Sequence, residues 1–380
     1  MGYLFHIFSY FPFTVLIVTL LVFVRPRTVR WYGKALWIAG LIFACSKFDV
    51  FRRLGSTYVP PQPEGLILFW NWAFCGVVFL CGLSLLFFWR FRWKGVVLPV
   101  VAGVLSAWGM WCALKTPDVR QVELSYADLP KELDGYRILH ISDLHASGVA
   151  REDRTRKIVE VANACSADII CLTGDYVDGE IAKCPDVLNP LRDLRAKDGV
   201  WAVTGNHEWF GQQKGWLKWY ADNGVRFLVN ECVFPRPSLA LGGVDDLEIV
   251  NYRRDLRARH PDVAQTFAAA TNGEFRVLLQ HQPLRTRENF ERHGVRLQLS
   301  GHTHGGIMPG LSLAVKRYSD GFLRGVYRFG NAVLFVSPGC GQTADLPLRF
   351  FTPSEITLIT LRSGQHTVPE SPRVQLKEHE

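Results

Sequence analysis

The nine cysteines of this 380-residue chain include no Cys-X-X-Cys pair, and no zinc-finger or helix-turn-helix spacing occurs elsewhere in it. A nucleic-acid partner is therefore not expected. The formal net charge of +8 does not change this, because the basic residues are scattered or flank apolar runs. That distribution favours a surface facing anionic lipid. A disulfide between Cys184 and Cys232 is compatible with an oxidising compartment, but the sequence does not select it.

Charge is also missing from long stretches of the first 115 residues, and this indicates a membrane region. A bilayer is crossed by roughly 20 apolar residues in a helix. The sequence predicts about four such helices, at 5–24, 31–48, 65–89 and 95–114. The apolar centre of 31–48 is short, so this helix reaches spanning length only if its flanking lysines extend to the interface. The N-terminus lacks the basic start of a cleaved signal peptide.

The number of helices decides on which side of the membrane the rest of the chain lies. With four helices, the basic loops 25–34 and 90–94 share one side. Because cytoplasmic loops carry the excess of lysine and arginine, the C-terminal domain is then outside. With three helices, the domain shares the side of the basic region 25–53 and lies inside. We favour four, and the sequence leaves the oligomeric state open.

Residues 116–363 read as one domain in which apolar strands alternate with helical segments. Helices are expected at 151–166 and 212–224, and "KTPDVRQ" (115–121) reads as a linker. The alternation predicts an α/β sandwich with buried sheets. The tail, 364–380, has no residues that would form a core and is expected to be disordered.

Residue types that bind metals follow the apolar strands of this domain. The residues in question are Asp143, His145, Asp175, Asn206, His207, His281, His302 and His304. Ligand sites in α/β sheets lie beyond the carboxyl ends of strands, so five strands would deliver these side chains to one edge. In a continuous strand, both histidines of "GHTH" would point to the same place. Individually each residue has an ordinary alternative, such as a helix cap for Asp143 or a core histidine for His281. Their recurrence at successive strand ends favours a shared metal centre.

The segments "DLH", "GDYVD", "GNHE", "LLQHQP" and "GHTH" resemble the five signature blocks of the calcineurin-like metallophosphoesterases. The resemblance covers roughly residues 122–361 and is strongest to a membrane-associated bacterial branch of that family. It implies a four-layer αββα sandwich. One difference is Ile307, where many relatives have glutamine after "GHTHGG". That difference concerns a contact at the pocket rim and no metal ligand.

The resemblance also implies two divalent metal ions, about 3.5–4 Å apart. Nitrogen and oxygen ligands together suit manganese, iron or zinc. By the family pattern Asp175 bridges the ions, and His207 is catalytic, either stabilising the transition state or protonating the leaving oxygen. One ion is expected to bind Asp143, His145 and His304, and the other Asn206, His281 and His302. Asp178 and Glu208 are candidates for orienting the imidazoles, or are simply solvated loop carboxylates.

The implied reaction is hydrolysis of a phosphate mono- or diester by a metal-bridging hydroxide. Held close to a bilayer, the site is expected to act on a phosphate ester of lipid or envelope origin, at the periplasmic side of a bacterial inner membrane. A cytoplasmic-facing nucleotide phosphodiesterase is the alternative if only three helices span. A non-enzymatic metal-binding sensor module is the other. The segments "GWLKWY" and "LSLAV" are compatible with lipid contact or with the core.

Overall fold

The structure, a computed structural model, describes Cys75 and residues 94–147, 150–178, 186–210, 213–246, 260–271, 273–307, 311–342 and 347–364. The helices predicted at 5–24, 31–48 and 65–89 lie outside this part of the chain apart from Cys75, as do Cys184 and all but the first residue of the tail. A helix does form over the fourth predicted segment, as α4 (Lys94–Leu114). Across the residues described, no helix combines the length and the hydrophobicity that crossing a membrane requires.

The first of two six-stranded sheets has the strand order β1-β12-β2-β3-β4-β5. Its strands are β1 (Asp118–Tyr126), β12 (Glu355–Ser363), β2 (Arg137–Ile141), β3 (Ile169–Thr173), β4 (Val200–Val203) and β5 (Arg226–Phe227). The strands from β2 to β5 run parallel, so their carboxyl ends lie along one edge of the sheet.

The second sheet has the order β10-β11-β9-β8-β7-β6. It contains β10 (Gly325–Phe329), β11 (Ala332–Val336), β9 (Leu297–Ser300), β8 (Phe275–Leu279), β7 (Leu239–Gly243) and β6 (Glu231–Arg236). Its four central strands are parallel, and the two outer strands pair antiparallel.

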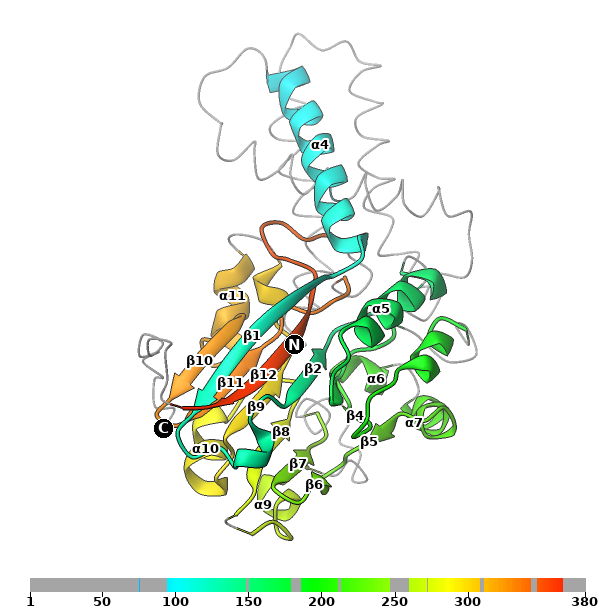
Figure 1. Cartoon of the computed structure of the whole chain (residues 1–380). Coiled ribbons are helices and arrows are strands. Elements are labelled where there is room, and N and C mark those ends of the chain that lie inside the picture. Colours follow the sequence, from blue (N-terminus) through cyan, green and yellow to red (C-terminus); the bar gives the residue numbers. More distant parts are fainter. Residues whose placement is uncertain are drawn as a thin grey trace.

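Helices cover the outer faces of the two sheets, which face each other (Figure 1). α5 (Glu152–Ala164) and α7 (Gln213–Asp222) pack on the first sheet, and α9 (Val263–Thr266) and α10 (Thr286–His293) pack on the second. α6 (Asn206–Phe210) and α11 (Leu311–Tyr318) follow β4 and the loop after β9, and short 3-10 turns lie at Lys131–Leu133, Asn189–Asp193 and His304–Gly306.

Alternating residues along each buried strand build this layering. Ile138 packs between the sheets, while its neighbour Leu139 packs on the other face, with Ile158 of α5. On the second sheet, Val277 faces the first sheet and Leu278 packs with Phe267, just beyond α9. Because successive side chains of a strand point to opposite faces, each sheet is buried on both sides. The predicted α/β sandwich is thus present, with helices outside two packed sheets.

Two expectations about particular segments are settled by this packing. The predicted linker is wrong from Asp118 onward, because β1 begins there and pairs parallel with β12 over its whole length. No local pattern indicates this pairing, since its partner lies at the other end of the domain. The aromatic segment of α7 belongs to the core, because Trp216 and Tyr220 are completely buried. Leu313 of α11, by contrast, is 75% exposed.

Candidate metal centre

The loops after five parallel strands meet at one edge of the sandwich. Beyond the strand ends, the loops after β2 and β3 stay paired through their backbones. Asp143 N–H donates to the Gly174 carbonyl at 3.0 Å, and His145 N–H donates to the Asp175 carbonyl at 3.0 Å. This pairing fixes the two loops side by side and brings their side chains together.

Five of the predicted ligands have left-handed backbone conformations, namely Asp143, His145, Asp175, His302 and His304, with φ between 45° and 69°. Residues other than glycine rarely adopt such angles, and they cluster at functional sites where the surrounding structure enforces them. The loops therefore turn sharply at the residues that carry chemistry.

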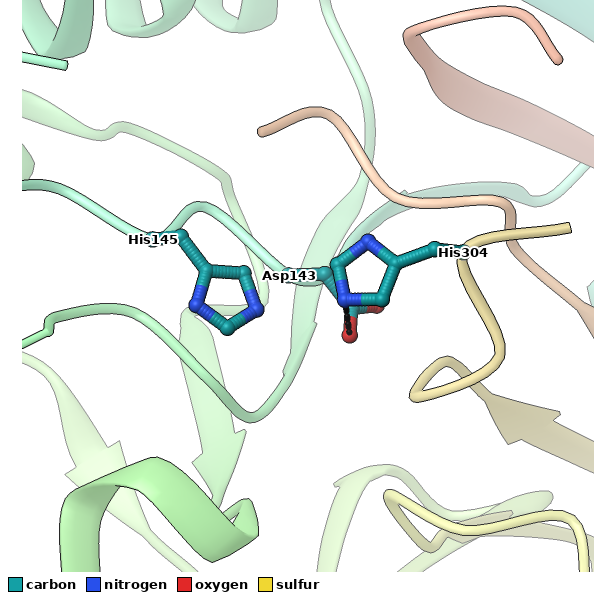
Figure 2. A group of neighbouring side chains, drawn as sticks. All are labelled: Asp143, His145 and His304. Carbon is teal, nitrogen blue, oxygen red and sulfur yellow. Dashed lines mark ion pairs between the residues drawn. The ribbon is translucent and has the colours of Figure 1, made fainter. Parts of the chain in front are cut away.

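The first group consists of Asp143, His145 and His304, all buried, with candidate ligand atoms within 4.8 Å of one another. Figure 2 shows the Asp143 carboxylate next to the His304 ring, with the His145 ring to one side of both. His304 Nε2 lies 3.6 Å from Asp143 Oδ1. Asp143 and His145 follow β2 of the first sheet, and His304 follows β9 of the second, so both sheets contribute to this group.

The second group consists of Asp175, His281 and His302. His302 Nδ1 lies 3.0 Å from Asn206 Oδ1 and 3.2 Å from His281 Nε2. The amide oxygen of Asn206 is therefore a further candidate metal-ligand atom in this group.

Asp175 belongs to the second group and also reaches the first. Its Oδ2 is 3.6 Å from His145 Nε2 and 3.2 Å from His281 Nε2. One carboxylate oxygen is thus close to an imidazole of each group, which is the position that a bridging ligand requires.

His302 and His304 do not converge, in contrast to the expectation from a continuous strand. β9 ends at Ser300, and the chain turns at both histidines. Each imidazole consequently belongs to a different group. The left-handed backbone at both histidines therefore turns their imidazoles apart, although the two residues are only two positions apart in the sequence.

The arrangement fits bound cations. His145 Nδ1 lies 2.8 Å from Asp178 Oδ1, so it carries the proton, and the buried Nε2 has no hydrogen-bond partner. His281 Nδ1 likewise lies 2.6 Å from the carbonyl of Thr173. The Nε2 atoms of both rings therefore lie on the side of Asp175, and a cation there would satisfy the lone pair of His145 Nε2.

Asp178 and His207 form a pair beside the first group. His207 Nδ1 lies 2.6 Å from the same oxygen of Asp178 that contacts His145, and the His207 side chain is 15% exposed. Burial would lower the pKa of His207, but the charges of Asp175 and Asp178 outweigh it and raise this pKa to about 10. A cationic imidazole with some access to solvent is suited to stabilise negative charge or to donate a proton.

Glu208 contacts the backbone, rather than an imidazole or solvent as the two alternatives from the sequence had it. Its carboxylate is buried and accepts three backbone N–H groups, from Asp175 at 2.9 Å, Tyr176 at 2.7 Å and Gly205 at 2.7 Å. It therefore holds the loops after β3 and β4 together. Burial and the charge of Asp175 raise its pKa to about 7.

Several residues of the centre were not identified from the sequence. Gly301 has no room for a side chain, since a Cβ there would lie 1.9 Å from Ser142 Oγ and 2.3 Å from Asp143 Oδ2. Arg349 is completely buried, with Nη2 3.5 Å from His304 Nδ1. A glycine in a signature block is a usable signal, whereas a lone arginine outside the five signature blocks is not. Ile307 is only 6% exposed, so its side chain does not form part of an accessible rim.

Comparison with known proteins agrees with the fold and the motifs. A family model described as calcineurin-like phosphoesterase matches residues 136–306. An uncharacterized metallophosphoesterase of Helicobacter pylori is 32% identical over 255 residues, which is 67% of this chain and 66% of that protein. The uncharacterized metallophosphoesterase YkuE of Bacillus subtilis is 30% identical over 288 residues, 71% of this chain and 96% of its own length.

A vertebrate relative is the transmembrane protein with metallophosphoesterase domain of Danio rerio, 29% identical over 279 residues. The match covers 71% of this chain and 63% of the fish protein. The chain thus spans about two thirds of the Helicobacter and Danio proteins and nearly all of the Bacillus protein. By sequence and by family model, this chain belongs to the calcineurin-like phosphoesterase family of metal-dependent hydrolases.

Proposed function

We propose that the chain hydrolyses a phosphate mono- or diester at a pair of divalent cations held by its two groups of ligands. The observation that supports this best is the position of Asp175, whose Oδ2 is within 3.6 Å of His145 Nε2 and 3.2 Å of His281 Nε2. A single carboxylate between two imidazole groups matches a site that holds two cations close together. Manganese, iron or zinc suits the mixture of nitrogen and oxygen donors.

The cations, once bound, would activate a water molecule and neutralise charge on the phosphoryl oxygens. Asp143, His145 and His304 would hold one ion, Asn206, His281 and His302 the other, and Asp175 both. The Nδ1–H groups of His145 and His281 are fixed by Asp178 and the Thr173 carbonyl, so the rings need no reorientation for binding.

His207 would act on the substrate. Asp178 holds its Nδ1, and the cationic ring would donate a hydrogen bond to a phosphoryl oxygen or a proton to the leaving group. The imidazoles of His145 and His304 are buried, whereas that of His207 is partly exposed. This difference supports a ligand role for the first two and a role toward the substrate for His207.

We further propose that a membrane region holds the site near a bilayer and that the substrate is a phosphate ester of lipid or envelope origin, reached from the periplasmic side of a bacterial inner membrane. The charge-free runs before residue 94 support anchoring. Two relatives, from Danio rerio and Bos taurus, are described as transmembrane proteins with a metallophosphoesterase domain. The exposed Leu313, on the helix that follows the "GHTH" loop, is compatible with an amphiphilic substrate.

The test is hydrolysis of bis-p-nitrophenyl phosphate by the full chain, with and without added manganese. We expect metal-dependent turnover in the parent and its near-complete loss in Asp175→Asn, because the bridging charge is gone. Asp222→Asn is the control, since Asp222 forms only an exposed ion pair with Lys218 on α7. Equal rates for Asp175→Asn and Asp222→Asn would refute the bridging role, and a parent that binds manganese without turnover would favour the sensor alternative.

A further inference from the structure

Two buried arginines link α4 to the first group of ligands. Arg154, in the first turn of α5, is 6% exposed, and Arg349 is 0% exposed. Most of the hydrogen bonds that they donate go to backbone carbonyls. Burying a guanidinium costs several kcal/mol unless its N–H groups find acceptors. Because moving either arginine would break these hydrogen bonds, the carbonyls that accept them are held in fixed positions.

Arg154 closes the C-terminal end of α4. Its Nε donates to the Leu114 carbonyl at 3.2 Å and its Nη2 to the Ala113 carbonyl at 3.2 Å. The last carbonyls of a helix lack partners within the helix, and a cation there is favourable. The same Nη2 donates to the Cys340 carbonyl at 2.5 Å, which joins the end of α4 to the loop after β11.

That loop supports the Asp143 backbone directly. Cys340 N–H donates to the Ser142 carbonyl at 2.9 Å, and Gly341 N–H donates to the Asp143 carbonyl at 2.7 Å. A Cβ on Gly341 would lie 2.0 Å from the Leu144 carbonyl, so the two backbones touch with no space between them. The conformation of Asp143 therefore depends on where this loop lies.

Arg349 joins the same loop to α4 and to His304. Its Nε donates to the Gly341 carbonyl at 2.7 Å and its Nη2 lies 3.5 Å from His304 Nδ1. Its own backbone N–H donates to the Gly109 carbonyl of α4 at 3.1 Å. Gly109 permits this approach, because a Cβ there would lie 2.5 Å from Leu348 Cδ1.

We propose that Arg349 is a positioning residue for His304 and Asp143. The packing of α4 against Leu348 and Arg349 thereby sets the affinity of the first group for its cation. This rests on the metal centre proposed above and adds a dependence on a helix that supplies no ligand.

Among the described residues, neither arginine donates a hydrogen bond to the second group: His281 Nδ1 lies 2.6 Å from the Thr173 carbonyl and His302 Nδ1 lies 3.0 Å from Asn206 Oδ1. A link between the groups at this point is the His302 N–H, which donates to the Asp143 carboxylate.

Two substitutions test the proposal from opposite ends. Arg349→Lys keeps the charge but cannot donate to both Gly341 and Pro353, as Arg349 does at 2.7 and 2.8 Å. Gly109→Val pushes α4 away from Leu348 without touching the centre. The matched controls are Arg236→Lys, whose arginine binds Asp198 before β4 at the opposite edge, and Val104→Leu on the exposed face of α4.

The measurement is manganese titration of the metal-depleted full chain, by calorimetry and by electron paramagnetic resonance. We expect two sites in the parent and both controls. In Arg349→Lys and Gly109→Val one dissociation constant should rise roughly 10- to 100-fold while the other stays, as for other residues that support metal ligands. The spectrum should then change from coupled manganese to an isolated ion.

The outcomes separate the two proposals. Parental affinities at both sites in Arg349→Lys or in Gly109→Val would overturn the inference, and so would equal weakening of both sites. A parent chain that binds no manganese would instead refute the proposed function. Thermal unfolding of each metal-free variant shows whether it is folded, and if Gly109→Val is not, Arg349→Lys decides the matter alone.

Discussion

Replacing Asp178 by asparagine tests how one carboxylate serves both a metal ligand and the proposed acid. Asp178 Oδ1 lies 2.8 Å from His145 Nδ1 and 2.6 Å from His207 Nδ1. Asparagine keeps an oxygen in place but removes the charge. A hydrogen bond to a charged acceptor contributes about 1.5–3 kcal/mol and a neutral one about 0.5–1.5 kcal/mol, so the two bonds together lose about 2 kcal/mol.

At His145 this loss reduces the basicity of Nε2, and we expect manganese to bind about tenfold or more weakly. At His207 the effect is on protonation. The charges of Asp175 and Asp178 raise its pKa against the effect of burial. Removing one of them lowers that pKa, by about one unit for each 1.4 kcal/mol lost. The alkaline limb of activity, where His207 loses its proton, should therefore move to lower pH.

The assay is kcat against pH for bis-p-nitrophenyl phosphate at saturating manganese, with Asp222→Asn as the control for removing a carboxylate from an exposed position. Manganese affinity is measured on the same preparations. An alkaline limb that stays in place, together with parental affinity, would show that Asp178 supports neither imidazole.

Two further predictions concern the backbone around the centre. Gly301→Ala places a Cβ 1.9 Å from Ser142 Oγ and 2.3 Å from Asp143 Oδ2, so we expect a lower Tm and loss of manganese from the first group; a parental manganese content would contradict this. Glu208→Ala leaves three backbone N–H groups without their acceptor, and at about 1–3 kcal/mol each the free energy of unfolding should fall by about 3 kcal/mol or more. Urea denaturation measures this, and an unchanged midpoint would show that water replaces the carboxylate.

The sequence carries much of this architecture because parallel strands impose a geometry. Five short apolar runs ending in polar residues predict an α/β sandwich with its chemistry at one edge, and β2, β3, β4, β8 and β9 are the strands that precede those residues. Periodicity says nothing about the path of a loop after a strand. For this reason periodicity did not predict the divergence of His302 and His304, which depends on backbone angles, and only the family resemblance assigned the two histidines to different ions.

The hydrogen bonds that support the metal centre could not be predicted from sequence patterns, for a different reason. Glu208 accepts hydrogen bonds from backbone N–H groups, and Arg154 and Arg349 donate to backbone carbonyls. Nearly every residue has these backbone groups, whatever its side chain. The sequence therefore gives no sign of the partner. β1 is similar, because its hydrogen bonds go to β12, and only the assembled sheet shows an edge that can accept another strand.

The left-handed turns at Asp143 and Asp175 have a consequence for how this protein would change over generations. Glycine adopts φ of 53° or 56° without steric strain, whereas other residues pay about 1 kcal/mol or more. Each carboxylate offsets that strain by accepting a backbone N–H, Asp143 from His302 at 3.0 Å and Asp175 from His207 at 2.9 Å. A descendant that no longer needed the cations would therefore be expected to keep both aspartates for as long as it kept these loop conformations.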